Sequence, residues 1–325
     1  MSQSGPADPP PAAPPGAGDH GPIARATGLV KRYGNTTVLD SADVEIETGT
    51  TGLLGANGAC KTTLIGLMLG LHQPDAGTIE VLGMSPRTAG PDIRMRIGYS
   101  PEHHLVPPEQ TANDFVRHMA QMHGLPADHA TERASDALFL VGLGEERFRP
   151  LGTMSTGQRQ RVKLAQAIAH APDLIFLDEP TDGLDPVQRD AMLELIAGLH
   201  ERTGASVVLS SHLLDEVERA CNRAVILTGG RVAESGTLSE LRGEGRGVVV
   251  DLDGADGQVD DLAAQLAAAE LTVERRGHRL TVSGELDADV LLDLIRDAIA
   301  DRDLGIRRLA GHTVSLRDVF VGAGR

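Results

Sequence analysis

The sequence of 325 residues has few cysteines, no long apolar run and no surplus of basic residues. Its two cysteines, Cys60 and Cys221, exclude a disulfide framework and fit a reducing compartment. No apolar run approaches the roughly 18 residues that mark a membrane-spanning helix, and the first residues lack the basic and apolar segments of a signal peptide. The formal net charge of −16 is atypical of nucleic-acid-binding proteins. We therefore expect a cytoplasmic protein without a nucleic-acid partner.

What the sequence does contain is a Gly-rich stretch directly after an apolar run that ends at Leu54. A helix is predicted to follow from Lys61. Backbone N–H groups of such a loop and of the first helical turn converge on one point, where the helix dipole favours an anion. Lys61 would reach the β- and γ-phosphates of a nucleotide, and the Thr62 hydroxyl would hold Mg²⁺. The predicted phosphate-binding stretch is Gly55, Ala56, Asn57, Gly58, Ala59, Cys60, Lys61, Thr62 and Thr63.

Two adjacent carboxylates, Asp178 and Glu179, follow the apolar run 174–177. Such a run is typical of a buried strand in a parallel sheet. Carboxylates at its end are costly unless they bind a cation or take part in chemistry. A further apolar run, 206–210, predicts another buried strand shortly before His212.

Four apolar runs of this kind end at or near Gly55, Glu102, Asp178 and His212. Open parallel sheets bind ligands beyond the carboxyl ends of their strands. We therefore expect all four residues at one edge of one sheet, as a shared nucleotide site requires.

The motifs resemble those of the ATP-binding subunits of ABC transporters over roughly residues 23–240. The stretch 55–63 resembles the Walker A loop, except that Cys60 stands where the family pattern has glycine. The other motifs, in chain order, are Lys31-Arg-Tyr-Gly34, Tyr99-Ser-Pro-Glu102 in the place of the Q-loop, Met154-Ser-Thr-Gly-Gln158 as the signature, Asp178-Glu-Pro-Thr181 as Walker B, Gly183-Leu-Asp-Pro186 as the D-loop, and His212 as the switch histidine. Tyr99–Glu102 and a small C-terminal domain make type-2 exporters the most similar group.

The resemblance implies roles for these residues. Asp178 would bind Mg²⁺ with Thr62 and Glu102, and the catalytic residues would be Glu179, His212 and Glu102. Tyr33 would stack on adenine. A head-to-tail dimer, homo- or heteromeric, would hold each ATP between Lys61 of one subunit and the signature residues of the other, which are Ser155, Thr156, Gly157 and Gln158.

The resemblance also implies an α/β fold of the P-loop NTPase type: a RecA-like core, an antiparallel β subdomain and a helical subdomain. The cassette would cover residues 23–240, with the helical subdomain at about 103–152. Residues 1–22, rich in Pro, Gly and Ala, predict a disordered tail. Alternating apolar and polar residues over 23–47 predict antiparallel strands.

Beyond the cassette, residues 246–325 predict a small α+β accessory domain. Strands are expected at 248–253, 271–275, 279–283 and 305–309, and helices at 258–269 and 287–300. This βαββαβ order is that of ferredoxin-like domains. A short amphipathic segment, 315–321, would end the chain.

Thr111 and Asp114 resemble a capping box at the start of a helix predicted over 111–123. This helix and the loop 102–108 follow a segment that the resemblance places beside the nucleotide. We expect them to dock the integral membrane permease that a chain without a membrane span needs, with Val106 and Phe115 on that surface.

The expected function is thus ATP binding and hydrolysis that powers an ABC transporter, an exporter by resemblance, on the cytoplasmic face of the membrane. Two alternatives remain. Cys60 adds a side chain where phosphate should pass, so the subunit would bind nucleotide in a regulatory or structural role with impaired hydrolysis. A soluble ABC ATPase unconnected with transport is the other alternative, which the single uninterrupted cassette disfavours.

Overall fold

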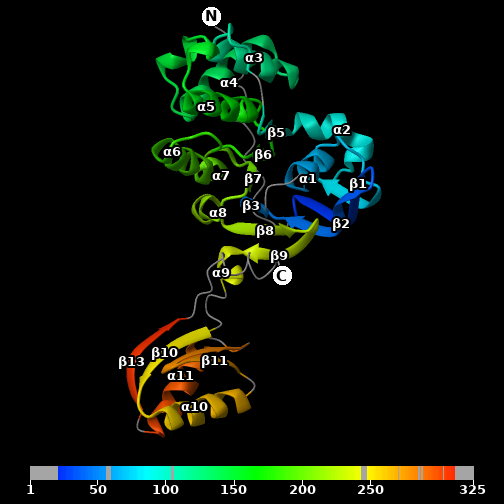
Figure 1. Ribbon diagram of the computed structural model, residues 1–325. Coiled ribbons are helices and arrows are strands. Elements are labelled where there is room, and N and C mark those ends of the chain that lie inside the picture. Colours follow the sequence, from blue (N-terminus) through cyan, green and yellow to red (C-terminus); the bar gives the residue numbers. More distant parts are fainter. Residues whose placement is uncertain are drawn as a thin grey trace, which may run out of the picture.

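The structure is a computed structural model that describes residues 21–55, 60–103, 106–242, 247–269, 271–284, 286, 288–302 and 304–311. Residues 1–20, residues 56–59 of the Gly-rich loop and the predicted segment 315–321 lie outside this part. Three sheets and their helices are present in it (Figure 1). Among the residues described, no helix combines the length and the apolar character needed to cross a bilayer.

The central sheet has six strands in the order β5-β6-β7-β3-β8-β9. Neighbouring strands are parallel from β5 to β8, and only β9 runs antiparallel. Every residue of β3, β6 and β7 is buried, because helices or other strands cover both faces. The bounds are β3 Thr50–Gly55, β5 Ile97–Ser100, β6 Leu174–Asp178, β7 Ser206–Ser211, β8 Arg223–Thr228 and β9 Arg231–Thr237.

The strands β5, β6, β7 and β3 are adjacent and parallel, so their carboxyl ends meet at one edge. Residues at or just after these ends are Gly55, Glu102, Asp178 and His212. The prediction that these four strand ends share one edge is therefore confirmed.

Alternate residues of each central strand enter two different cores. Ile175 and Leu177 pack with helices α5 and α6, which are Thr156–Ile168 and Pro186–Ala197. Phe176 enters the core that includes α1, Cys60–Met68, and an antiparallel sheet. Figure 1 shows α6 on one side of the central sheet and α1 on the other.

The antiparallel sheet has the order β2-β1-β4, with β1 Ala24–Tyr33, β2 Thr36–Ile46 and β4 Ala76–Val81. It contains the predicted hairpin, since β1 and β2 pair around Gly34. Gly34 has φ +58°, a conformation that glycine adopts without the penalty of a side chain. Tyr33 is the last residue of β1, and its side chain lies next to this turn.

A group of helices follows β5. Helix α3 is Ala112–Met122, and its N-cap Thr111 accepts a hydrogen bond from the Asp114 backbone N–H, as the sequence predicted. Phe115 does not lie on the surface: its side chain is 4 % exposed and packs in the core, so its expected place on a docking surface is wrong. The other helices after β5 are α4 Ala127–Leu140 and the 3-10 helices η1 Glu145–Phe148 and η2 Leu151–Thr153, whereas α2 Pro86–Met95 directly precedes β5.

Three short helices complete the first part of the chain: α7 Leu199–Thr203, α8 Leu214–Ala220 and α9 Leu238–Leu241. Helix α8 directly follows His212 and packs on α6 and β3. It therefore packs close to the edge of the central sheet that carries the candidate site.

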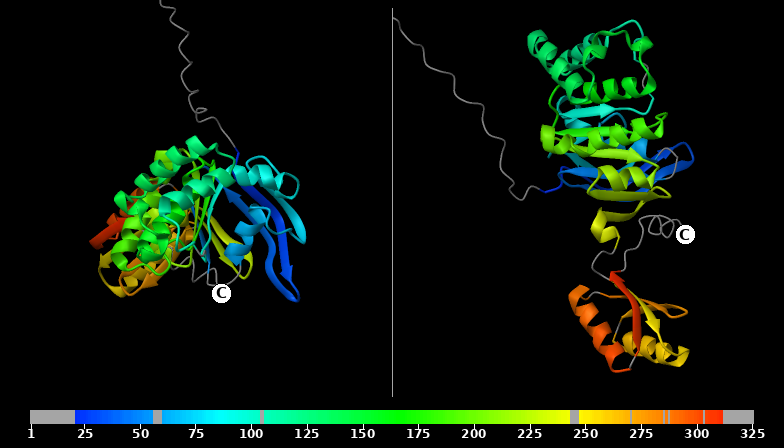
Figure 2. Two further views of the ribbon diagram at one scale, coloured as in Figure 1. Left: turned by 90° about the horizontal axis from the view of Figure 1, so that it is seen from above. Right: turned by 90° about the vertical axis from the view of Figure 1, so that its left-hand side faces the viewer.

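The C-terminal unit has its own core and its own sheet, in the order β11-β12-β10-β13 (Figures 1 and 2). All neighbouring strands in it are antiparallel. The two outer strands in chain order, β10 and β13, are neighbours in the sheet, as in a ferredoxin-like unit. The elements are β10 Gly247–Asp253, α10 Asp256–Ala268, β11 Thr272–Arg276, β12 Arg279–Ser283, α11 Ala288–Ala300 and β13 Gly305–Gly311.

Helix α5 lies so close to β5 that only glycine fits at position 98. A Cβ on Gly98 would be 1.9 Å from the Ala167 carbonyl oxygen. On the next residue of the strand, the Tyr99 carbonyl accepts a hydrogen bond from Gln166 Nε2 at 2.7 Å. This contact fixes the strand that leads to Glu102.

We predict that Gly98→Ala lowers the free energy of unfolding by about 1–3 kcal/mol, because backbone must move to admit the methyl group. Urea unfolding monitored by circular dichroism measures the change. Gly198→Ala is the matched control: Gly198 has φ −85°, and its added Cβ would be 3.3 Å from the flexible Arg202 side chain. Equal stability of the two variants would contradict the close packing of α5 on β5.

Candidate functional site

The helix that follows the Gly-rich loop brings Lys61 back to the strand end. Lys61 is 4 % exposed, and its Nζ donates to the Gly55 carbonyl oxygen at 2.8 Å. Gly55 is itself confined, since a Cβ there would be 3.1 Å from the Leu227 carbonyl oxygen. Thr63, in the same turn, is also buried. The predicted residues Ala56, Asn57, Gly58 and Ala59 lie outside the residues described.

Thr62 and Asp178 form the oxygen-rich part of the site. Thr62 Oγ1 donates to Asp178 Oδ2 at 2.9 Å. The second carboxylate oxygen, Asp178 Oδ1, is buried and accepts no hydrogen bond from the residues described. A buried carboxylate oxygen with a free lone pair beside a hydroxyl group is a donor set for a small hard cation, and it fits Mg²⁺.

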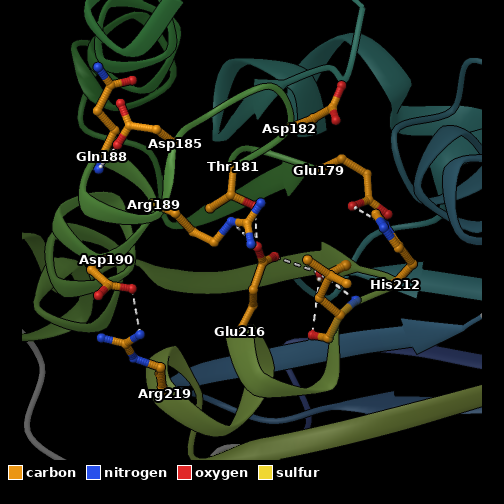
Figure 3. A network of polar contacts seen from close by, with 12 residues as sticks. Glu179, Thr181, Asp182, Asp185, Gln188, Arg189, Asp190, His212, Glu216 and Arg219 are labelled. Carbon is orange, nitrogen blue, oxygen red and sulfur yellow. Dashed lines mark hydrogen bonds and ion pairs between the residues drawn. The ribbon is translucent and has the colours of Figure 1, made fainter.

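Glu179 lies between the ammonium group of Lys61 and the imidazole ring of His212. Its Oε1 is 3.1 Å from Lys61 Nζ. Its Oε2 is 2.9 Å from His212 Nδ1, a contact that Figure 3 shows. The side chain is 10 % exposed. Its backbone has φ +47°, a left-handed conformation that costs a non-glycine residue on the order of 1–3 kcal/mol. The fold thus holds this carboxylate in a strained position at the end of β6.

Glu102 lies at the rim of the site and outside this cluster. Its side chain is 38 % exposed, and its Oε1 is 3.5 Å from His103 Nε2. Burial raises the pKa of Tyr99 to about 12, and the charges of Asp178 and Glu102 add to this effect. Burial lowers the pKa of Lys163, against the pull of the same two carboxylates. Lys163 Nζ donates to the Glu102 carbonyl oxygen at 3.0 Å, which holds the loop near the cluster.

The signature residues form a separate structure at the start of α5. Ser155 is its N-cap, and the capping box is complete: Ser155 Oγ accepts from the Gln158 N–H at 3.2 Å and Gln158 Oε1 accepts from the Ser155 N–H at 3.1 Å. A Cβ on Gly157 would be 2.7 Å from Gln188 Oε1. Thr156 is exposed. No hydrogen bond or ion pair between the described residues of one chain joins these four residues to Lys61 or Glu179.

Tyr33 is also apart from the cluster. Its ring is 45 % exposed at the end of β1, edge-on to His72 with 6.2 Å between the ring centroids. The Lys31 Nζ lies 5.3 Å from the Tyr33 ring centroid. An exposed ring of this kind offers a stacking surface.

Sequence reasoning missed Glu216, a carboxylate that is 2 % exposed beneath the cluster. It lies in the first turn of α8, where acidic residues usually point to solvent and complement the helix dipole. Nothing in the local pattern distinguishes it from such a residue.

Comparison with known proteins agrees with this geometry. The profile of the ABC transporter family matches residues 39–182. The chain is 34 % identical over 264 residues to the daunorubicin/doxorubicin resistance ATP-binding protein of Streptomyces peucetius, covering 80 % of each chain. It is 32 % identical over 311 residues to the Nod factor export ATP-binding protein I of Ralstonia nicotianae, covering 95 % of this chain and 96 % of that protein. This chain belongs to the ABC transporter ATP-binding proteins.

A solved structure of an ATP-binding subunit of an ABC transporter superposes on it with a TM-score of 0.60 at 30 % identity, over 68 % of this chain and 92 % of that one. The α/β cassette fold predicted from the sequence is thereby confirmed. As a member of this family the cassette binds nucleotide and hydrolyses ATP. ATP-binding subunits of ABC transporters dimerise and pair with membrane permease subunits.

Cys60 departs from the family pattern at the start of α1. It is the first residue of the helix, so its backbone is helical and open to every L-amino acid. Its side chain is half-buried and packs against the core. The backbone strain that glycine would relieve is therefore absent, and the effect of Cys60 on binding must come from the volume of its side chain.

We predict that Cys60→Gly increases nucleotide affinity by up to about tenfold, equivalent to 1.4 kcal/mol, and raises the ATPase rate. Fluorescent-nucleotide titration and phosphate release measure the two effects. We also expect Mg-ATP to protect Cys60 from alkylation. Cys221 is the internal control, because burial raises the pKa of its thiol and leaves little reactive thiolate.

Equal affinity and rate in the Cys60→Gly and parent proteins would show that the loop does not need glycine here. Alkylation of Cys60 at the same rate with saturating Mg-ATP would place the nucleotide elsewhere.

Proposed function

We propose that this cassette hydrolyses ATP at the cluster of Lys61, Thr62, Asp178, Glu179 and His212, and that it powers an exporter together with a separate permease. The observation that carries the proposal is the position of Glu179. It is a buried carboxylate held between Lys61 Nζ and His212 Nδ1, one residue after an aspartate with a free oxygen.

In the proposed reaction a water oxygen attacks the γ-phosphorus in line with the leaving group. The bond between this phosphorus and the β–γ bridging oxygen breaks, and Glu179 accepts the proton of the water. Lys61 and His212 lie on either side of Glu179, where they can stabilise charge on the γ-phosphate. A phosphate gives Lys61 a new anionic partner, so nucleotide binding competes with the Lys61–Glu179 ion pair.

Thr62 and Asp178 would hold Mg²⁺, with Glu102 nearby at the rim. Bound there, the ion would neutralise phosphate charge. The free Asp178 Oδ1 supports this assignment.

The signature residues Ser155, Thr156, Gly157 and Gln158 are proposed to act on the nucleotide of a second subunit. Their separation from Lys61 within one chain supports this arrangement, since they would complete a site only across a head-to-tail dimer. The partner cassette is a second copy or a related chain. Tyr33 is proposed to stack on the adenine.

Export is proposed because similar proteins carry the names of drug resistance and Nod factor export proteins. The proposed location is the cytoplasmic face of the membrane, and the proposed domain limits remain 1–22, 23–240 and 246–325.

A nucleotide-binding subunit with impaired hydrolysis is the second candidate function, and Cys60 is the observation that favours it. Comparing ATPase rate with nucleotide affinity separates the two.

We predict that Glu179→Gln keeps ATP binding but slows hydrolysis by about 10²–10⁴-fold, because the amide cannot accept the proton. Light scattering with Mg-ATP should then show a trapped dimer. Glu201→Gln, at an exposed position on α7, is the matched control and should hydrolyse ATP at the parent rate. Hydrolysis by Glu179→Gln at the parent rate would show that another group is the base.

The proposed permease-docking surface is a groove of about 870 Å³ that is lined by residues between β5 and α3, by η2 and by α5. Val106, Pro108 and Leu151 supply apolar walls, and Glu102 and Lys163 connect the groove to the nucleotide site. A groove that shares Glu102 and Lys163 with the rim of the nucleotide site would let nucleotide binding change the permease interface.

We predict that single cysteines at Val106, in the groove, and at Met122, which is 71 % exposed on α3, form cross-links to a co-expressed permease in a background without Cys60 and Cys221. A cysteine at Glu201 is the control and should not react. Efficient cross-links only from a cysteine at Asp261, exposed on α10 of the C-terminal unit, would contradict the docking surface.

A further inference from the structure

Glu216 is a buried carboxylate with three partners from three parts of the chain: the loop after β6, strand β7 and helix α6. Its Oε1 accepts a hydrogen bond from Thr181 Oγ1 at 2.6 Å, and its Oε2 accepts one from Ser211 Oγ at 2.7 Å. Arg189 Nε lies 3.5 Å from Oε1. The Glu216 side chain is 2 % exposed, and Figure 3 shows it beside Thr181 and Arg189. Burying a carboxylate this deeply carries a desolvation penalty. The contacts of Glu216 show which parts of the chain it holds in place.

The first contact controls the loop that carries Glu179. Thr181 is buried two residues after Glu179. Its carbonyl oxygen accepts from the Leu184 N–H at 3.2 Å, and the Glu179 carbonyl oxygen accepts from the Asp182 N–H at 3.1 Å. Glu216 therefore anchors the turn that keeps Glu179 in its left-handed conformation.

The second contact controls the turn that carries His212. Ser211 Oγ donates to Glu216 and accepts a hydrogen bond from the Leu213 N–H at 3.0 Å. His212 lies between these two residues, with its Nδ1 2.9 Å from Glu179 Oε2. One carboxylate thus orients the hydroxyl group that fixes the backbone on both sides of His212.

The third contact reaches α6. The Arg189 N–H donates to the carbonyl oxygen of Asp185, the N-cap of that helix. Asp185 belongs to the motif Gly183-Leu-Asp-Pro186, which precedes α6. The ion pair therefore connects the start of α6 with the two loops of the catalytic cluster.

We propose that Glu216 is a positioning residue for ATP hydrolysis: it sets Glu179 and His212 relative to each other without touching the nucleotide. The inference rests on the proposed role of Glu179. It requires that loss of the carboxylate misplace the base while the phosphate-binding stretch stays intact, because no hydrogen bond or ion pair between described residues joins Glu216 to Lys61 or Thr62.

The test is Glu216→Gln, which keeps the size of the side chain. The amide presents one acceptor oxygen to two hydroxyl donors, so one of the contacts with Thr181 and Ser211 must change. We expect kcat per folded molecule to fall by about 10–100-fold, the effect of a small misplacement of a catalytic group. The KM for ATP and the Kd for ADP should stay within about twofold. Glu218→Gln is the matched control: Glu218 lies on the same helix and pairs with Arg242 at 3.1 Å, away from the cluster.

Thr181 supplies a double-mutant cycle. As a single variant, Thr181→Val should lower kcat. In the double variant with Glu216→Gln, kcat should fall no further than in the more severely affected single variant, because the two residues act as one unit. Thr181→Ser keeps the hydroxyl group and should retain the parent rate. If Glu216→Gln does not fold, Thr181→Val and Thr181→Ser decide the question by the same kcat comparison.

A parent kcat in Glu216→Gln, or a parallel loss of nucleotide affinity, would overturn the positioning role. Multiplicative losses in the double variant would do so as well. Glu179→Gln keeps these outcomes distinct from failure of the proposed function. If Glu179→Gln abolishes hydrolysis and Glu216→Gln does not affect it, only the present inference is wrong; if Glu179→Gln is itself active, the assignment of the base is wrong.

Discussion

The parallel pairing of β6 with β7 is the constraint on which the site depends. Asp178 lies opposite Ser210 in the register of these strands, and the Glu179 N–H donates to the Ser210 carbonyl oxygen at 3.0 Å. On its other side β7 pairs with β3, with Leu54 opposite Ser211. A slip of one residue would turn every side chain of a strand to the opposite face. The register therefore brings the residues that follow three separate strands into one space, before any contact between their side chains forms.

The site and its support bring several charged side chains together where they are almost fully buried. Lys61, Asp178 and Glu216 are each no more than 4 % exposed, and an unpaired charge at such a depth costs several kcal/mol. Each of the three has a partner of opposite charge or a hydroxyl donor. Two features of the site are nevertheless unfavourable in energy. One is the Asp178 Oδ1 atom, which has no hydrogen-bond partner among the described residues, and the other is the left-handed backbone of Glu179. The first lies where a cation is proposed to bind and the second where a water molecule is proposed to react, as expected when function and not stability selects the geometry.

The sequence predicts most of the fold and the centre of the site, because both depend on local signals. The apolar run 174–177 identifies a buried parallel strand, and Thr111 with Asp114 identifies the start of α3. Helix α2 was not predicted, since Gly90 and Pro91 interrupt its pattern and the structure has a kink at Ala89.

Other features depend on tertiary contacts that the local sequence does not contain. Helical spacing predicts that Phe115 lies on α3, but it does not show which face of this helix the rest of the protein covers. Glu216 looks like an ordinary acidic residue in a first helical turn, and only the approach of Thr181, Ser211 and Arg189 makes it a buried centre. A prediction from one sequence therefore finds the residues that end the strands better than those that support them from below.

The same distinction explains why Cys60 is compatible with the fold. The helix that it begins is held by Leu64, Ile65 and Leu67, which are fully buried, and a helical backbone does not require glycine at its first residue. The demand for glycine in the Walker A pattern comes from the ligand, whose phosphate oxygens need close approach to the loop backbone. A side chain at this position is therefore compatible with the helix, and its volume is expected to act mainly where the phosphate oxygens approach the loop.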